Sequence, residues 1–168
     1  MARHSIFGAA LTVILALPAS AGGTLEGRLV TMNTLLYDDP AAPLMESRGR
    51  TVKVGAGVEF GMGPEGGQNG FDVVPVQVEI LPSRIEISYG AESGSFWPAR
   101  FNGYVLRFTT DCALFAKVSV DRTGTTMALD DSDIRVTTDA LFINVEGLSY
   151  GPDQWIALDF EVSDCTLS

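Results

Sequence analysis

The sequence predicts an all-β protein, a single antiparallel β-sandwich or jelly roll of about nine strands. Apolar and polar residues alternate with a period of two through most of the chain beyond residue 21. This is the pattern of a strand with one buried and one solvated face. Segments rich in Gly and Pro separate the alternating stretches, as turns do, and no ten-residue run shows helical spacing.

The expected strands follow one another at short intervals along the chain. They cover 24–31, 51–60, 74–80, 84–89, 103–108, 115–121, 133–137, 140–146 and 155–162. In the segment 51–60, alternation places Val58 and Phe60 in the core and Glu59 in water. In the last segment, it predicts that Asp159 and Glu161 face water while their apolar neighbours face the core, namely Ile156, Leu158, Phe160 and Val162.

Size and charge limit the class of protein. A chain of 168 residues forms one domain, and a hydrophobic content of 46% is enough for a packed core. The net charge of −10 excludes a nucleic-acid-binding protein, because such proteins neutralise phosphates with basic residues. The same charge argues against docking on an anionic membrane face.

The first residues have the three parts of a secretory signal peptide. Arg3 starts the segment, an apolar run covers 6–17, and small residues end it at Ala21. The run is shorter than the roughly 20 residues that a membrane-spanning helix needs. We therefore expect 1–21 to be cleaved and 22–168 to be a secreted domain without membrane insertion.

Cleavage of this signal peptide would remove His4, the single histidine of the chain. Ser-His and Cys-His nucleophile pairs and histidine zinc sites are then excluded, and we expect no enzyme. One enzyme class remains as an alternative, since carboxylate pairs hydrolyse glycosides without histidine. Its candidates are the carboxylates on expected strands: Glu59, Glu79, Glu86, Glu146, Asp159 and Glu161.

Cys112 and Cys165 are the two cysteines, and both lie in the expected secreted domain. A cysteine pair in an oxidising compartment most simply forms one disulfide. Closing a loop of this length stabilises a fold by about 4 kcal/mol at most.

The densest acidic cluster contains Asp130, Asp131 and Asp133. Closely spaced oxygen ligands suit Ca²⁺, the one cofactor that the sequence suggests. The cluster lacks the glycine and glutamate positions of an EF-hand. The alternative is a solvated turn, in which Asp and Ser bond to nearby backbone groups.

The segment 90–102 is the strongest candidate for a binding loop. Phe96 and Trp97 supply aromatic rings, which stack on sugars and anchor protein interfaces. Arg100 and Asn102 supply hydrogen-bond donors. The alternative, which we favour slightly from sequence, is that Trp97 closes the open end of the core.

Several stretches resemble a known kind of domain. They are Val54-Gly55-Ala56-Gly57-Val58-Glu59-Phe60, Phe101-Asn102-Gly103-Tyr104, Ile134-Arg135-Val136, Asn144-Val145-Glu146-Gly147-Leu148-Ser149 and Ile156-Ala157-Leu158-Asp159. Together they resemble small exported β-sandwich domains of bacteria, such as those of PEP-CTERM-type surface-sorted proteins. The resemblance implies export and fold, and it transfers no catalytic residue. The chain departs from the pattern because 165–168 is not an apolar sorting tail and because its cysteine pair is additional.

These observations lead to one expectation and two alternatives. We expect a secreted, non-catalytic bacterial protein that acts in surface or matrix binding or assembly. Its setting would be the periplasm, the cell surface or the extracellular space, and its partner a glycan or another surface protein. The alternatives are a glycan-binding module, with or without calcium dependence, and a carboxylate-based glycan-active enzyme.

Overall fold

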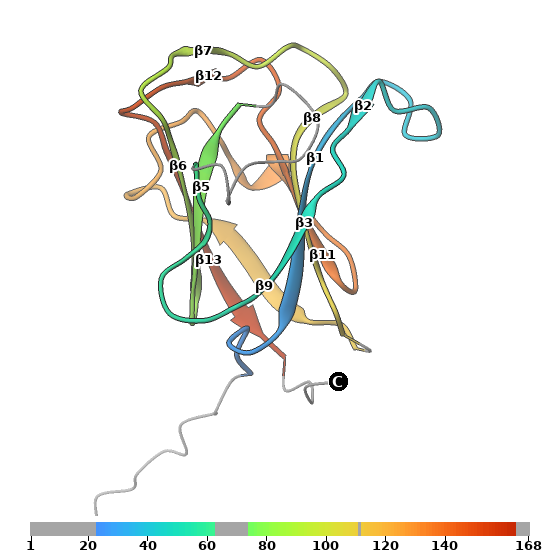
Figure 1. The fold of residues 1–168 in the computed structure, drawn as a ribbon, viewed down its shortest axis with the longest axis vertical. Helices are drawn as coiled ribbons and strands as arrows, with labels where there is room; N and C mark the ends of the chain where they lie inside the picture. Colours follow the sequence, from blue (N-terminus) through green and yellow to red (C-terminus); the bar gives the residue numbers. More distant parts are fainter. Residues whose placement is uncertain (1–22, 63–73, 111, 164–168) are drawn as a thin grey trace, which may run out of the picture.

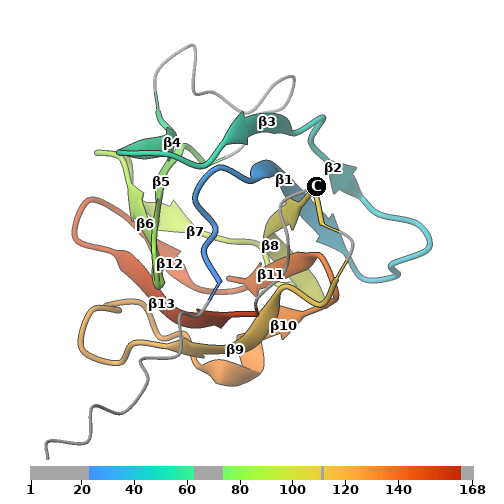
Figure 2. The ribbon, with the colours of Figure 1, turned by 90° about the horizontal axis from the view of Figure 1, so that it is seen from below.

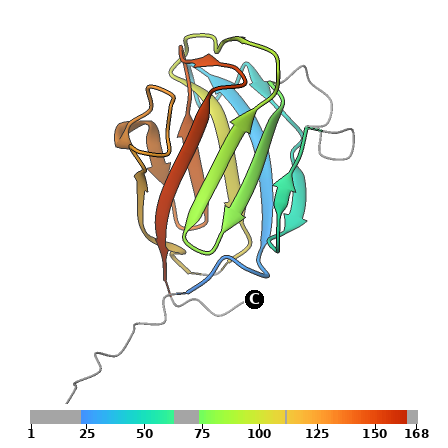
Figure 3. The same cartoon turned by 90° about the vertical axis from the view of Figure 1, so that its left-hand side faces the viewer.

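The computed structural model describes residues 23–62, 74–110 and 112–163. In this part of the chain the fold is nearly all β, with one short 3₁₀ turn, η1 (Asp131–Asp133). Two antiparallel sheets pack face to face, which confirms the predicted sandwich (Figures 1 and 3). The described residues form 13 strands rather than about nine.

The first sheet has the order β10-β11-β8-β1, and two short strands share the outer edge of β1. Every pairing in it is antiparallel. Its strands are β1 (Leu29–Tyr37), β2 (Met45–Glu46), β3 (Arg50–Lys53), β8 (Phe101–Phe108), β10 (Ile134–Val136) and β11 (Ala140–Asn144).

The second sheet has the order β4-β5-β6-β13-β9. Its strands are β4 (Val58–Phe60), β5 (Val76–Leu81), β6 (Arg84–Tyr89), β9 (Phe115–Val120) and β13 (Trp155–Val162). A separate ribbon pairs β7 (Gly94–Ser95) with β12 (Ser149–Tyr150). In Figure 1 this ribbon lies across the upper end of the sandwich, and Figure 2 gives the view from the opposite end.

The core lies between the two sheets and follows the predicted alternation on β13. Ile156, Leu158, Phe160 and Val162 are buried, whereas Asp159 and Glu161 are exposed. The same cluster includes inward residues of the first sheet, namely Val30, Met32, Tyr104, Leu106, Phe108, Leu141 and Ile143. The predicted orientation of β13 is therefore confirmed.

The predicted strand 51–60 is wrong, because the chain crosses between the sheets within it. β3 pairs with β1 in the first sheet, and β4 pairs with β5 in the second. Between them Gly57 adopts a φ of +90°, which favours glycine, and an irregularity in the pairing between Val58 and Phe60 breaks the alternation. Val58 is 45% exposed and Glu59 is buried, against the prediction, whereas the predicted burial of Phe60 is confirmed.

Glu59 fixes this crossing through its carboxylate. One oxygen accepts a hydrogen bond from the backbone N–H of Gly55 at 3.0 Å, and the other accepts one from Ile80 at 2.7 Å. A buried carboxylate needs such partners, since burying an unpaired charge is costly. The alternation of apolar and polar residues does not reveal that a carboxylate will be buried with such partners.

Two other differences concern where β1 begins and which very short strands form. β1 begins at Leu29 rather than residue 24, after a turn in which Arg28 N–H donates to the carbonyl of Leu25. The three two-residue strands β2, β7 and β12 were not expected, since two residues are too few to show a period.

Some expectations fall outside the described residues. The proposed signal segment 1–21 and Cys165 are among them, so cleavage and the Cys112–Cys165 bond stay predictions. Within the described ranges no helix is long and apolar enough to cross a membrane.

Candidate functional site: a hollow at one end of the sandwich

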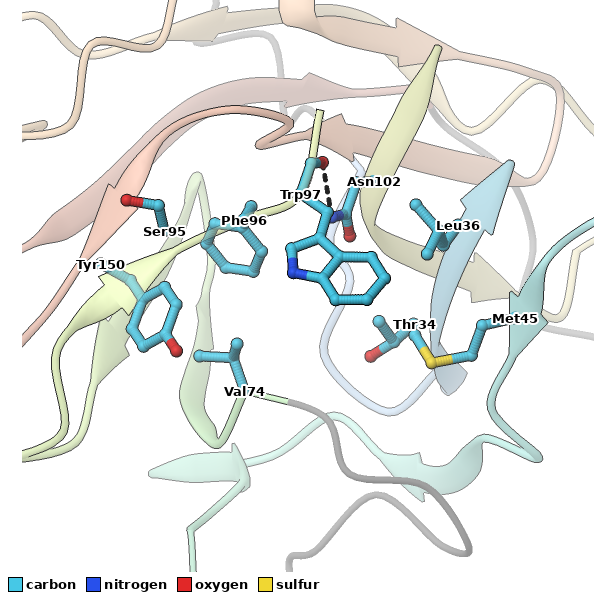
Figure 4. A pocket seen from close by; sticks show the side chains of 9 residues that line it. All are labelled: Thr34, Leu36, Met45, Val74, Ser95, Phe96, Trp97, Asn102 and Tyr150. Atoms are coloured by element: carbon cyan, nitrogen blue, oxygen red, sulfur yellow. Dashed lines mark hydrogen bonds between the residues drawn. The ribbon is translucent and has the colours of Figure 1, made fainter. Parts of the chain in front are cut away.

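An open hollow of about 270 Å³ lies at the end of the sandwich that carries the β7–β12 ribbon. Strands β1, β2, β7, β8 and β12 all contribute to it, so residues far apart in the sequence meet there (Figure 4). None of its nine described lining residues is charged: they are Thr34, Leu36, Met45, Val74, Ser95, Phe96, Trp97, Asn102 and Tyr150.

The first sheet forms one wall because of the period of β1. Thr34 and Leu36 have the same strand parity as the core residue Met32, so they continue its inner face past the packed core. On the neighbouring strand β8, Thr34 is paired with Tyr104 and Leu36 with Asn102. This register brings the polar groups of two strands to the same end of the sheet.

Phe96 closes the core at this end. It is 7% exposed, and its ring packs edge-on against Tyr89 at 6.1 Å and Tyr104 at 6.3 Å between centroids. Its backbone N–H donates to the carbonyl of Leu148 at 2.9 Å, next to the β7–β12 ribbon. The ring of Tyr150 lies 5.1 Å away on the solvent side of this group.

Trp97 is 75% exposed, so the interpretation that it closes the core is wrong. Successive side chains of an extended segment point to opposite sides, and Phe96 takes the inner place. The Trp97 indole instead stands at the rim of the hollow (Figure 4).

Asn102 holds the backbone of Trp97 in position. Its side-chain Nδ2 donates to the carbonyl of Trp97 at 3.0 Å, and its own backbone N–H donates to Oδ1 of Asn144 at 3.0 Å. Asn102 is 7% exposed, so it is a fixed part of the wall. Of the four predicted binding residues, only Arg100 does not line the hollow, and its backbone N–H donates to Oδ1 of Asp38 at 3.0 Å.

Three hydroxyls at this end are buried, those of Thr34, Tyr89 and Tyr104. Burial raises the pKa of the Tyr89 and Tyr104 hydroxyls, and these two hydroxyls also interact with each other, which raises the pKa of Tyr104 further. Both stay protonated at neutral pH. The Thr34 hydroxyl, in contrast, has no hydrogen-bond partner among the described residues. Because buried polar groups normally have partners, this unpaired hydroxyl needs an explanation.

The acidic cluster Asp130, Asp131 and Asp133 does not line the hollow, and its carboxylates accept hydrogen bonds from backbone N–H groups. Asp130 accepts from Ser132 N–H at 2.7 Å, Asp131 from Val120 N–H at 2.7 Å, and Asp133 from Asp130 N–H at 3.0 Å. These bonds cap η1 and join it to β9, and the Ser132 donors lower the pKa of Asp130. The described residues contain no group of three or more His, Cys, Asp or Glu arranged to hold a metal ion.

Two of the candidate catalytic carboxylates meet at Arg84 on the outer face of the second sheet. Arg84 donates to Glu86 at 2.9 Å, to Asp159 at 3.0 Å and to Asp121 at 2.5 Å. Asp121 also accepts from the backbone and hydroxyl of Thr123, and these donors with Arg84 hold its pKa well below the usual range. Glu86 and Asp159 therefore lie in one network of ion pairs on this face.

Comparisons with known proteins identify no relative. No protein-family model matches the chain, and neither a curated protein nor a solved structure matches it significantly. The likeness to bacterial surface-sorted domains thus stays an expectation.

Sequence analysis missed most of the hollow's lining. Phe96, Trp97 and Asn102 are candidates from sequence, whereas the other six are not, namely Thr34, Leu36, Met45, Val74, Ser95 and Tyr150. One signal was present in β1, where a polar residue interrupts the alternating apolar series Val30, Met32, Thr34, Leu36. A hydroxyl at an inward position is a sign of a site or of a buried partner.

Proposed function

We propose that this chain is an exported, non-catalytic binding protein that receives an uncharged group in the hollow beside Trp97. One observation carries the proposal: a largely exposed tryptophan borders an open hollow whose described lining residues carry no charge. Bacterial surface or matrix binding is the setting that the signal-like residues 1–21 favour.

The exposure of Trp97 supports a binding role. Tryptophan is highly buried on average, and it is enriched at the energetically dominant positions of interfaces. Here the ring does not close the core, because Phe96 does, and its backbone is tied down by Asn102. Because this backbone is already held, a partner that covers the ring orders little more than the side chain itself.

The size of the hollow supports recognition of one ring-sized group. Ligand pockets usually measure about 300–1,000 Å³, and this one is about 270 Å³. A group of that size would be part of a larger partner, either a glycan or a side chain of another surface protein. Both partners agree with a role in surface or matrix binding.

A matched pair of tryptophan variants tests the proposal. Neutral ring compounds, namely cyclohexanol and a set of methyl glycosides, would be titrated by protein-observed NMR against the mature chain. We expect saturable shifts that Trp97→Ala abolishes and Trp155→Ala preserves, because Trp155 is also exposed but does not line the hollow. If no neutral probe gives a saturable response, or if both variants bind like the parent, the proposal fails.

A further inference from the structure

We infer that the group received beside Trp97 is the ring of a neutral sugar. The inference rests on the proposed binding function and names its ligand class. It comes from the combination, in one hollow, of an exposed aromatic face with several uncharged hydrogen-bonding groups. A sugar ring presents the same combination, with a C–H face for stacking and hydroxyls around its edge.

The polar groups of the hollow match such hydroxyls in kind. The Thr34 hydroxyl is buried in its wall and has no hydrogen-bond partner in the described part of the chain. Asn102 uses its Nδ2 to hold Trp97, which leaves its amide oxygen as an acceptor. The Ser95 hydroxyl has a long contact of 3.3 Å with Ser149, and Tyr150 lines the hollow with a phenol group.

These groups lie on two sides of the indole ring, with Phe96 between the ring and the ribbon residues. In Figure 4, Ser95 and Tyr150 from the ribbon lie on one side of Trp97, and Thr34 from β1 lies on the other. A sugar stacked on the indole would therefore meet hydroxyl or amide groups at more than one edge. An apolar side chain of a protein partner would leave those groups without partners, which is unfavourable when water is displaced.

Charge favours a neutral sugar over an acidic one. No described residue lining the hollow is cationic, and Arg100 lies outside that lining. The chain has a net charge of −10, so an anionic ligand would be repelled. Hydroxyl and amide groups, in contrast, match a ligand without formal charge.

The experiment compares three kinds of probe on the intact mature chain by protein-observed NMR titration. The probes are neutral methyl pyranosides of glucose, galactose, mannose and N-acetylglucosamine, the acidic methyl glucuronide, and cyclohexanol as a ring with a single hydroxyl. We expect at least one neutral pyranoside to bind about 10-fold more tightly than cyclohexanol and than the glucuronide.

Two hydroxyl deletions complete the test. Thr34→Val and Tyr150→Phe remove one hydroxyl each with little change in shape, and each should weaken the pyranoside about five-fold or more while leaving cyclohexanol unchanged. The matched control is Thr31→Val, because Thr31 lies on the same strand with the opposite parity and bonds to Thr51. Melting curves of the variants verify that each one is folded.

The outcomes separate the inference from the function on which it rests. If cyclohexanol binds as well as every pyranoside, or if neither deletion changes the preference, the sugar inference fails and an apolar side chain of a protein partner becomes the occupant. Preference for the glucuronide also overturns it. If no probe binds, both the inference and the proposed function fail.

Discussion

The outer face around Arg84 has polar groups that are charged and paired, whereas the hollow beside Trp97 has neutral polar groups, one of them unpaired. At Arg84 every charge has a partner, since one guanidinium joins three carboxylates and Asp121 also accepts from Thr123. In the hollow the polar groups are neutral, and the Thr34 hydroxyl has no partner among the described residues. Both regions contain chemically suggestive residues, but only one leaves hydrogen-bonding capacity for a ligand.

A dense group of functional residues is therefore not by itself a binding site. Paired groups stabilise the fold modestly, whereas a buried group left unpaired costs more than a pair contributes. A protein retains an unpaired buried group where a ligand forms the missing hydrogen bond. The comparison predicts distinct stability effects at the two regions, and mutations can test it.

The largest expected effect separates Phe96 from Trp97. Phe96→Ala should lower the free energy of unfolding by about 3–5 kcal/mol, because it removes a buried ring from the aromatic group that closes the core. Trp97→Ala should change it by less than about 1 kcal/mol, as at other exposed positions. Urea unfolding of both variants checks this. Equal losses would show that the hollow's rim is part of the core.

A smaller effect is expected at Arg84. Arg84→Met should lower the free energy of unfolding by about 1–2 kcal/mol, because partly exposed pairs contribute about 0.2–1 kcal/mol each and three carboxylates would face one another without a cation. The loss should shrink in high salt, which screens their repulsion. A urea midpoint that is unchanged in low salt would mean that the pairs contribute nothing.

The pairing at Asp121 predicts a pH dependence of defined sign. Its folded pKa is lowered by the Thr123 and Arg84 donors, so it stabilises the fold above its unfolded pKa of about 4 and loses that contribution as pH falls through the folded value. Asp121→Asn should therefore be less stable than the parent at neutral pH, and the difference should narrow below about pH 4.

Asp153→Asn is the control for this prediction. Asp153 is exposed, and its carboxylate forms no ion pair or hydrogen bond with the described residues. Its variant should follow the parent across the same range of pH. A constant difference between Asp121→Asn and the parent at every pH would contradict the role of the lowered pKa.

The smallest expected effect is at Thr34, and it has the opposite sign to most core mutations. Thr34→Val should leave the free energy of unfolding unchanged or raise it by up to about 1 kcal/mol, because it replaces an unpaired buried hydroxyl with a methyl group of similar size. Thermal unfolding without ligand measures it. A clear loss of stability would show that the hydroxyl already has a structural partner.

Periodicity and composition are enough to predict the fold class and the faces of the regular strands. Alternation places Ile156 and Leu158 in the core and Asp159 in water, and the structure confirms this, because a strand with one solvated face has no other stable orientation. The same information marked Trp97 and Asn102 as candidates through residue type alone.

The place where the chain changes sheets and the set of residues that share a site depend on tertiary contacts. The crossing at Gly57 turned Glu59 inward, and Phe96 rather than Trp97 took the place at the end of the core. Thr34 and Tyr150 meet in one hollow although more than a hundred positions separate them in the sequence. The period of apolar residues in the sequence indicates which face of its own strand a residue occupies. Contacts between strands depend on pairing order and register, which the chain adopts only when both sheets pack around a common core.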